Sequence, residues 1–213
     1  MSSINKYPTF QYSQPSDYHF SHDSVFLARE VFERHSDQLT QPEIKVLDLC
    51  AGCGIVGMDL LFHQLKEKSF NGEADFLEVQ EIYEPHFNKN KEIMQGYFPN
   101  SPLDFNFIHQ NYADVSTHKK YDFILSNPPY FLLGQGVKSP SEFKNRCRFF
   151  IDSDWQTMLR FMQASLKPEG QAYFLVRDEL KDIISQQPAS EVTFPFQVRT
   201  AWVGHMKKLT SIY

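Results

Sequence analysis

The regular alternation of short apolar strands with longer helical segments constrains the fold of this chain more than any other feature of its sequence. Short β-branched or alternating apolar runs predict strands at residues 44–49, 72–79, 103–111, 121–126, 171–176 and 196–205. Helical spacing predicts helices at residues 24–37, from a glycine loop to about 63, 84–97 and 155–166. Strands that alternate with helices form parallel βαβ units with helices on both faces of the sheet. The sequence therefore predicts an α/β fold, with a Rossmann-like, doubly wound and mostly parallel sheet in a single domain.

Length and composition agree with one folded domain. The chain has 213 residues, of which 41% are hydrophobic, enough to build a sizeable core. We expect residues 1–40 to form an N-terminal extension whose helix contributes to the binding site, and residues 41–213 to form the main domain. No segment is apolar enough to span a membrane and the first 20 residues have no apolar signal core, which predicts a cytoplasmic protein.

The charge and the cysteines argue against some classes of function. The formal net charge of -5 disfavours a generally basic nucleic-acid coat, although it is compatible with a local basic patch. Cys50 and Cys53 form a C-x-x-C pair, but no second pair follows, and two ligands do not close a tetrahedral zinc site. We therefore expect neither a metal nor a redox role for these cysteines, which are small side chains in a glycine turn.

A glycine loop follows the first predicted strand. Residues 52–57 match G-x-G-x-x-G, a pattern that alone also fits a nicotinamide or flavin cofactor, or an ordinary strand-to-helix turn. Asp48, however, ends the strand four residues before Gly52, where a carboxylate suits a cationic ligand such as the ammonium group of S-adenosylmethionine. Gly52 and Gly54 have no Cβ, so the backbone can approach a ligand closely. The spacing of these three residues resembles the first motif of class I S-adenosylmethionine-dependent methyltransferases.

Two other predicted strand ends carry polar side chains, at the edge where parallel sheets bind their ligands. A carboxylate at Glu78 can accept both hydroxyls of a ribose, and residues 77–80 resemble the second motif of these enzymes; Glu81 is the neighbouring alternative. At Asn111 the family usually has an aspartate that accepts from the adenine amino group of the cofactor. An asparagine still accepts through its carbonyl, with Tyr112 or the backbone as a further contact.

Residues 127–130, Asn-Pro-Pro-Tyr, directly follow the fourth predicted strand. The residue before a proline is held extended and proline has no backbone donor, so the loop is stiff. It presents the Asn127 amide, the Pro128 carbonyl and the Tyr130 ring together, a set that suits a planar amine. Two acceptors for the amine hydrogens free its lone pair for methylation, while Tyr130 stacks on the base and Phe131 forms a second wall. The motif resembles that of methyltransferases that modify amino groups of adenine, guanine or a glutamine amide.

One resemblance covers most of the chain. Residues 18–28, 127–134 and 146–148 are similar to the bacterial tRNA (adenine-N(6))-methyltransferase family that acts on valine tRNA. The resemblance implies that Asp23 or Ser21 touches the cofactor, with helix capping as the alternative role.

A basic segment follows the motif and carries Lys138, Lys144, Arg146 and Arg148 with few acids. Together with residues 207–208 it could form a local phosphate-binding face, or it could be a solvated loop. We expect Lys138 and Arg146 to bind the substrate.

Several functions stay open on the sequence alone. The first is methyl transfer from S-adenosylmethionine to N(6) of adenine in RNA, most directly tRNA, by a monomer or weak dimer that needs no metal and no membrane. Release-factor glutamine methyltransferases share the motif but usually have a long N-terminal helical domain. The remaining alternatives are an rRNA guanine or DNA adenine methyltransferase, and a non-catalytic module that keeps the cofactor fold.

Overall fold

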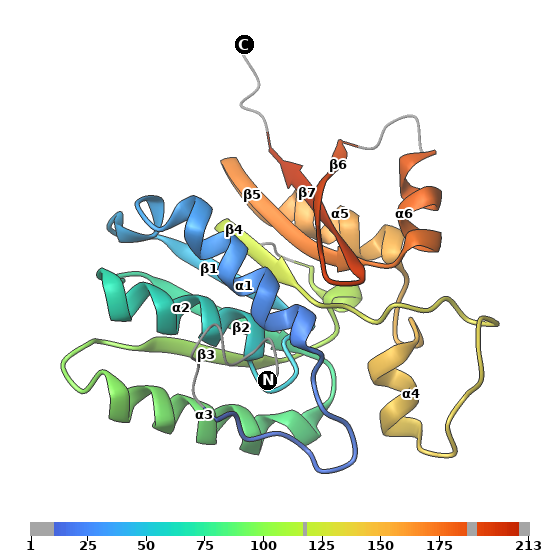
Figure 1. The fold of residues 1–213 in the computed structure, drawn as a ribbon, viewed down its shortest axis with the longest axis horizontal. Helices are drawn as coiled ribbons and strands as arrows, with labels where there is room; N and C mark the ends of the chain where they lie inside the picture. The colour runs from blue at the N-terminus through green and yellow to red at the C-terminus, as the bar shows by residue number, and fades with distance from the viewer. Residues whose placement is uncertain (1–10, 117–118, 187–190, 209–213) are drawn as a thin grey trace.

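The computed structural model describes residues 11–116, 119–186 and 191–208, which form one seven-stranded sheet flanked by helices (Figure 1). The strands lie in the order β3-β2-β1-β4-β5-β7-β6. They are β1 (Lys45–Leu49), β2 (Glu73–Glu78), β3 (Asp104–His109), β4 (Tyr121–Ser126), β5 (Leu166–Val176), β6 (Val192–Val198) and β7 (Ala201–Lys207). The helices are α1 (His22–His35), α2 (Ile55–Glu67), α3 (Glu84–Tyr97), α4 (Glu142–Arg148), α5 (Trp155–Ser165) and α6 (Asp178–Ser185), with short 3-10 helices η2 (Gln38–Thr40), η3 (Glu81–Tyr83) and η4 (Tyr112–Asp114). Residues 1–10 of the predicted extension lie outside the described residues.

The register of the parallel strands brings the predicted site residues to one edge of the sheet. β1 to β5 run parallel, and Leu49 at the end of β1 pairs with Leu77 of β2 and Ser126 of β4. The chain therefore leaves these strands at the same level, where the loop after Leu49 meets Glu78 and Asn127. The strand order also reverses between β1 and β4, the position at which open α/β sheets form their ligand crevice.

Helices cover both faces of the sheet because alternate strand side chains enter two different cores. On one face, α1, α2 and α3 pack against strand residues such as Val46 and Phe76. On the other face, α5 and α6 pack against their neighbours Leu47 and Leu77. Figure 1 shows α1 in front of the sheet and α5 behind it. Val25 of α1 is fully buried, so this helix is part of the first core.

The last strands differ from the prediction. A single strand at 196–205 is wrong, because β6 and β7 form an antiparallel pair that turns at Arg199 and Thr200, and β7 runs antiparallel to β5. Arg199 takes the left-handed conformation, with a φ of 55°. The apolar alternation runs through both strands, and the turn contains no glycine, proline or asparagine to mark it.

Two helices and one strand start also differ from the prediction. No helix is predicted for the segments that form α4 and α6, which have only seven and eight residues. β5 begins at Leu166, where the prediction ends a helix, and it passes an irregularity before Gln171 instead of following a loop. Gly170 is required in that irregularity, because a Cβ would lie 2.9 Å from the carbonyl oxygens of Lys167 and Tyr121.

Candidate functional site

A cavity of about 1090 Å³, its open mouth included, lies at the carboxyl edge of the sheet. A concave site at this edge of an α/β sheet is where such folds bind small-molecule ligands. The predicted site residues in its lining are Ser21, Gly52, Glu78, Asn111, Tyr112, Asn127, Pro128, Tyr130 and Arg146. The predicted residues outside the lining are Asp23, Asp48, Gly54, Phe131 and Lys138.

The glycine loop depends on left-handed backbone. Cys50, Gly52 and Gly54 have φ values of 58°, 54° and 85°. Gly54 also packs tightly, because a Cβ there would lie 3.1 Å from both Cε of Met58 and Cδ2 of Phe87. The loop thus turns from β1 into α2 with its backbone at the cavity, as the lining by Gly52 shows.

Asp48 supports this loop from behind. Its side chain is buried, and Oδ2 accepts a hydrogen bond from the Gly57 amide at 2.7 Å. Burial raises the pKa of Asp48 well above its usual range; the Gly57 hydrogen bond opposes the rise and the charge of Glu78 adds to it. In this position Asp48 fixes the start of α2, and its contact with a cofactor stays a prediction.

Glu78 is tied to the loop and keeps acceptor capacity. Oε2 accepts from the Gly52 amide at 2.8 Å and Oε1 from the Gln80 amide at 2.9 Å. A carboxylate has about four lone-pair sites, so about two stay available for donors such as ribose hydroxyls. Burial raises the pKa of Glu78 against the lowering effect of those two hydrogen bonds. The alternative, Glu81, is exposed and outside the lining.

Asn111 and Tyr112 form the wall beside the end of β3. Asn111 Oδ1 accepts from the Ala113 amide at 2.9 Å, and Nδ2 donates to the Asp152 carbonyl at 2.8 Å. The Tyr112 hydroxyl donates to the Asp154 carbonyl at 3.4 Å. The carbonyl oxygen of Asn111 keeps one lone pair, which is enough to accept from an adenine amino group. That contact with the cofactor stays a prediction.

The Asn127 amide is hydrogen-bonded to α1. Its Nδ2 donates to Oγ of Ser24 at 2.7 Å, and Ser24 is fully buried on α1. Because the amide nitrogen is directed at Ser24, its carbonyl oxygen is left for a different donor. Asn127, Ser24 and Pro128 all line the cavity. The arrangement can present two carbonyl oxygens, from Asn127 and Pro128, to the hydrogens of an amine.

Tyr130 and Phe131 are bound to the end of α4. Both backbone amides donate to the Arg148 carbonyl, at 3.1 and 2.9 Å. The Arg177 guanidinium lies over the Tyr130 ring, with Cζ 4.8 Å from the centroid. Phe131 packs against Phe149 with their ring centroids 5.6 Å apart. Phe149, and not Phe131, lines the cavity, so the predicted second wall for a base fits Phe149 better.

Asp23 lies outside the cavity lining. Its carboxylate lies 3.5 Å from Nε of Arg199 and 4.0 Å from Nη2 of Arg177. Burial raises the pKa of Asp23, against the lowering effect of the two arginines. Asp23 thus connects α1 to the β6–β7 turn, while Ser21 lines the cavity and makes no side-chain capping hydrogen bond.

The predicted basic face is wrong in part. Lys207 forms an ion pair with Glu169 at 2.8 Å and pairs with Gln171 in the middle of β5. Because β7 is antiparallel, it carries Lys207 and Lys208 to the sheet edge opposite the cavity, far from α4. Lys138 is exposed and lies in the segment between the Asn-Pro-Pro-Tyr motif and α4.

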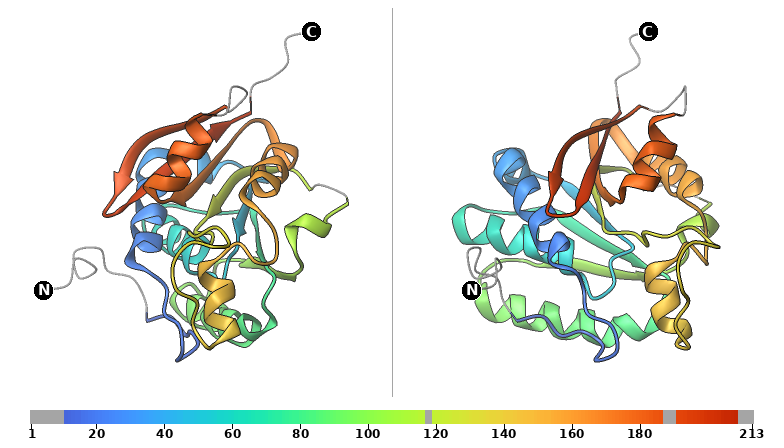
Figure 2. Two further views of the ribbon diagram at one scale, coloured as in Figure 1. Left: turned by 90° about the vertical axis from the view of Figure 1, so that its right-hand side faces the viewer. Right: turned by 45° about the vertical axis from the view of Figure 1, so that its right-hand side comes forward.

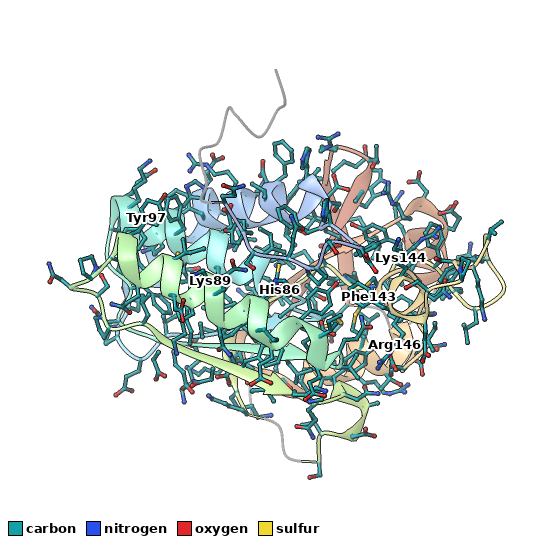
Figure 3. All side chains as sticks on the ribbon, turned by 90° about the horizontal axis from the view of Figure 1, so that it is seen from below. His86, Lys89, Tyr97, Phe143, Lys144 and Arg146 are labelled. Atoms are coloured by element: carbon teal, nitrogen blue, oxygen red, sulfur yellow. The ribbon has the colours of Figure 1, made fainter. Side chains whose placement is uncertain are left out.

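Arg146 is held by a carboxylate in the cavity wall. Its Nε and Nη2 donate to Asp152, at 2.9 Å to Oδ2 and 2.7 Å to Oδ1. Figure 3 shows Phe143, Lys144 and Arg146 of α4 beyond the end of α3 that carries His86. Substrate binding by Arg146 stays a prediction, and its guanidinium is already paired in this structure.

Sequence reasoning missed side chains whose partners lie far away in the chain. Ser24 and Asn127 are 103 residues apart. Cys147 Sγ lies 3.2 Å from the Tyr83 hydroxyl and 3.4 Å from Nε2 of Gln80, which attaches α4 to the end of β2. Apart from the family resemblance of residues 18–28, 77–80 and 146–148, no local pattern marks Ser24, Gln80 or Cys147, and none marks Tyr83.

Other classes of site find little support. Cys50 and Cys53 are free cysteines, and burial raises the pKa of Cys53 to about 12. Within residues 11–116, 119–186 and 191–208, no group of three or more His, Cys, Asp or Glu side chains could hold a metal ion. In the same part of the chain, no helix has the length and apolar character needed to cross a membrane.

No protein-family model matches the chain. Curated relatives include the tRNA1(Val) (adenine(37)-N6)-methyltransferases of Pedobacter heparinus, 24% identical over 131 residues, and of Dyadobacter fermentans, 26% identical over 126 residues. These matches cover 62% and 59% of this chain and 51% and 48% of the relatives. The chain thus spans about half the length of the curated relatives it matches.

Solved structures establish the fold. The Thermus thermophilus 16S rRNA N2 G1207 methyltransferase, in complex with AdoMet and guanosine, superposes with a TM-score of 0.62 at 18% identity, over 91% of this chain and 44% of that one. A proposed RNA methyltransferase from Pyrococcus horikoshii superposes with a TM-score of 0.60 at 13% identity, over 97% of both chains. The chain has the Rossmann-like fold of class I methyltransferases, and the predicted fold class is confirmed.

Proposed function

We propose that this chain transfers the methyl group of S-adenosylmethionine to the exocyclic N(6) amino group of adenine in RNA, most directly in tRNA. The observation that carries the proposal is the Asn127 amide, which Ser24 orients in the same cavity as Glu78 and the glycine loop. The curated relatives named above support adenine in tRNA as the target.

The glycine-loop side of the cavity fits the cofactor. Glu78 has acceptor sites for two ribose hydroxyls, Asn111 and Tyr112 flank the place for an adenine ring, and Gly52 admits the ligand close to the backbone. When bound, S-adenosylmethionine supplies an electrophilic methyl group on a sulfonium sulfur.

The motif side of the cavity prepares the amine. The carbonyl oxygens of Asn127 and Pro128 accept its two hydrogens, which draws the nitrogen lone pair out of conjugation with the ring. The same two oxygens stabilise the positive charge that develops on nitrogen as the new bond forms. Tyr130 offers the ring face away from Arg177 for stacking on an extruded base.

Transfer to unmodified bulk tRNA tests the proposal. After incubation with labelled S-adenosylmethionine, nucleoside mass spectrometry should detect N(6)-methyladenosine. N2-methylguanosine in its place, or label in a release factor supplied in a parallel incubation and none in RNA, would refute adenine as the target.

The Asn127→Ala variant separates catalysis from binding. The variant lacks one of the two oxygens that accept the hydrogens of the amine. Methyl transfer should slow by about 100-fold or more, because that oxygen stabilises the positive charge of the transition state. Calorimetry should find the affinity for S-adenosylmethionine within about twofold of the unaltered chain. An equal loss of transfer rate and of cofactor affinity would assign Asn127 a structural role. If the unaltered chain did not bind S-adenosylmethionine, a non-catalytic module would be favoured.

A further inference from the structure

The loop that leaves the Asn-Pro-Pro-Tyr motif carries exposed apolar side chains. Val137 is 84% exposed and Leu133 is 59% exposed. The other large apolar side chains found exposed in the described part of the chain, Ile82, Tyr97 and Ile151, are isolated from one another in the sequence. Single exposed apolar residues need no explanation, but two of them in one short loop beside a substrate motif point to a contact.

The loop is anchored at both ends. Before it, the Phe131 amide donates to the Arg148 carbonyl at 2.9 Å. After it, the Ser139 amide donates to Oδ1 of Asn145, and Nδ2 of Asn145 donates to the Ser139 carbonyl, both at 2.7 Å. Residues 132–138 therefore project from two fixed points on the same short helix, α4.

The tip of the loop is a turn surrounded by open space. Gly134 and Gly136 have φ values of 93° and 70°, and nothing lies within 4 Å of a Cβ built on either. The Gln135 amide donates to the Leu132 carbonyl at 3.1 Å, and Oε1 of Gln135 accepts from the Leu132 amide at 3.0 Å. Figure 1 shows the segment between β4 and α4 reaching the edge of the molecule, and Figure 2 shows it from the side.

We propose that residues 132–138 are a wedge that enters a folded region of the RNA substrate and fills the space left by the target base. The inference rests on the proposed function, because an adenine inside a base stack cannot reach Asn127 and must be extruded. Leu133 and Val137 supply the apolar surface that such wedges place against the neighbouring bases. The cost of unstacking is thereby reduced at the point where the base leaves the stack.

The charge around the loop favours RNA as the occupant. Residues 131–141 contain no acidic side chain, and Lys138 is exposed next to the apolar tip. At the base of the loop the Arg148 guanidinium lies over the rings of Phe131 and Phe149, 5.6 and 5.4 Å from their centroids. An exposed lysine beside an apolar tip, in a loop without acidic side chains, complements a phosphate backbone with accessible bases.

The double variant Leu133→Ser, Val137→Ser tests the wedge. Tyr97→Ser is the matched control, because Tyr97 is 57% exposed and lies at the end of α3 away from α4 (Figure 3). Transfer is measured on folded unmodified tRNA and on a short unstructured RNA that contains adenine. We expect the double variant to lose about tenfold or more in kcat/KM on folded tRNA and less than about twofold on the short RNA, since only the folded substrate must unstack. The control should change neither value.

A direct readout of extrusion accompanies the kinetics. With 2-aminopurine at the methylated position of the tRNA, fluorescence should rise when the unaltered chain binds and stay quenched with the double variant. An equal rise with both proteins, an unchanged kcat/KM on folded tRNA, or an equal loss on both RNAs would overturn the wedge. So would a change in oligomeric state with unchanged tRNA kinetics, which would assign the loop to self-association.

Failure of the wedge can be told apart from failure of the proposed methyl transfer. Equal melting temperatures and equal affinities for S-adenosylmethionine show that the variants are folded. If the unaltered chain methylates neither RNA, the proposed function fails and the wedge fails with it, whereas a loss confined to the double variant on folded tRNA supports both.

Discussion

Ser24 anchors the Asn127 amide by a hydrogen bond, so Ser24→Ala should slow methyl transfer without weakening cofactor binding. In the structure the amide nitrogen donates to Ser24 Oγ at 2.7 Å. With alanine at this position, the nitrogen would face a methyl group in a buried setting. The amide would then rotate, so that its nitrogen reaches water in the cavity and its carbonyl oxygen turns away from the substrate.

The expected size follows from the lost hydrogen bond. A buried donor left without a partner costs about 1–3 kcal/mol. In the rotated form the carbonyl oxygen faces the same methyl group, so the two penalties partly cancel and the productive orientation should lie about 1 kcal/mol above the rotated one. Since about 1.4 kcal/mol corresponds to a factor of ten in rate, kcat should fall about fivefold.

Single-turnover transfer to tRNA, together with calorimetric titration of S-adenosylmethionine, measures the two effects separately. Ser165→Ala is the matched control, because Ser165 is also fully buried but lies on α5, outside the cavity lining. Ser24→Cys should give an intermediate rate, since a thiol is a weaker acceptor of similar shape. An unchanged kcat in Ser24→Ala, or a parallel loss of cofactor affinity, would refute the reasoning.

Three further predictions concern the cofactor side of the site. Glu78→Gln should weaken S-adenosylmethionine binding by about tenfold or more in calorimetry, because a charge-assisted acceptor of hydroxyl groups is lost; an unchanged affinity would contradict this. Burial raises the pKa of Asp48 and Glu78, so the folded chain binds their protons more tightly than the unfolded chain. The stability that these two groups contribute is therefore fully present below about pH 4 and is lost as the pH rises through their raised pKa values. Over the same range the affinity for S-adenosylmethionine should increase as Glu78 ionises. Denaturant titrations measure the stability and calorimetry measures the affinity, and a stability or an affinity that does not change with pH would contradict the raised pKa values. Gly57→Ala should lower the free energy of unfolding by about 1–3 kcal/mol, because its Cβ would lie 2.7 Å from Cε1 of Phe76, whereas Gly96→Ala, with nothing within 4 Å, should be neutral or stabilising in the same thermal melts.

The parts of the fold that local patterns encode could be predicted from the sequence. The strand predicted at 121–126 coincides with β4, because its apolar residues are followed by prolines that end it. The β6–β7 turn could not be predicted, since Arg199 and Thr200 interrupt no apolar alternation. α4 has seven residues, too few for helical spacing to show, and tertiary contacts such as the Arg146–Asp152 pair hold it in place.

The candidate site divides in the same way. Glycines and prolines mark positions where the backbone itself must take a special form, so Gly52 and the motif around Asn127 are recognisable from the sequence. The cofactor contacts of Asp48, Asn111 and Asp23 stay predictions, and for Asp23 the structure offers ion pairs with two arginines instead. Such long-range pairs depend on how elements pack, which no local pattern specifies.

The pair of Ser24 and Asn127 has a consequence for how the chain works as a unit. It crosses the boundary predicted at residue 40, and the helix that carries Ser24 also buries Val25 and Ala28 completely against the sheet. A fragment without α1 would retain the glycine loop and Glu78 in its sequence but would expose the core that α1 covers. It would lose the group that orients the Asn127 amide, so we expect α1 to belong to the catalytic unit and not to a separable extension.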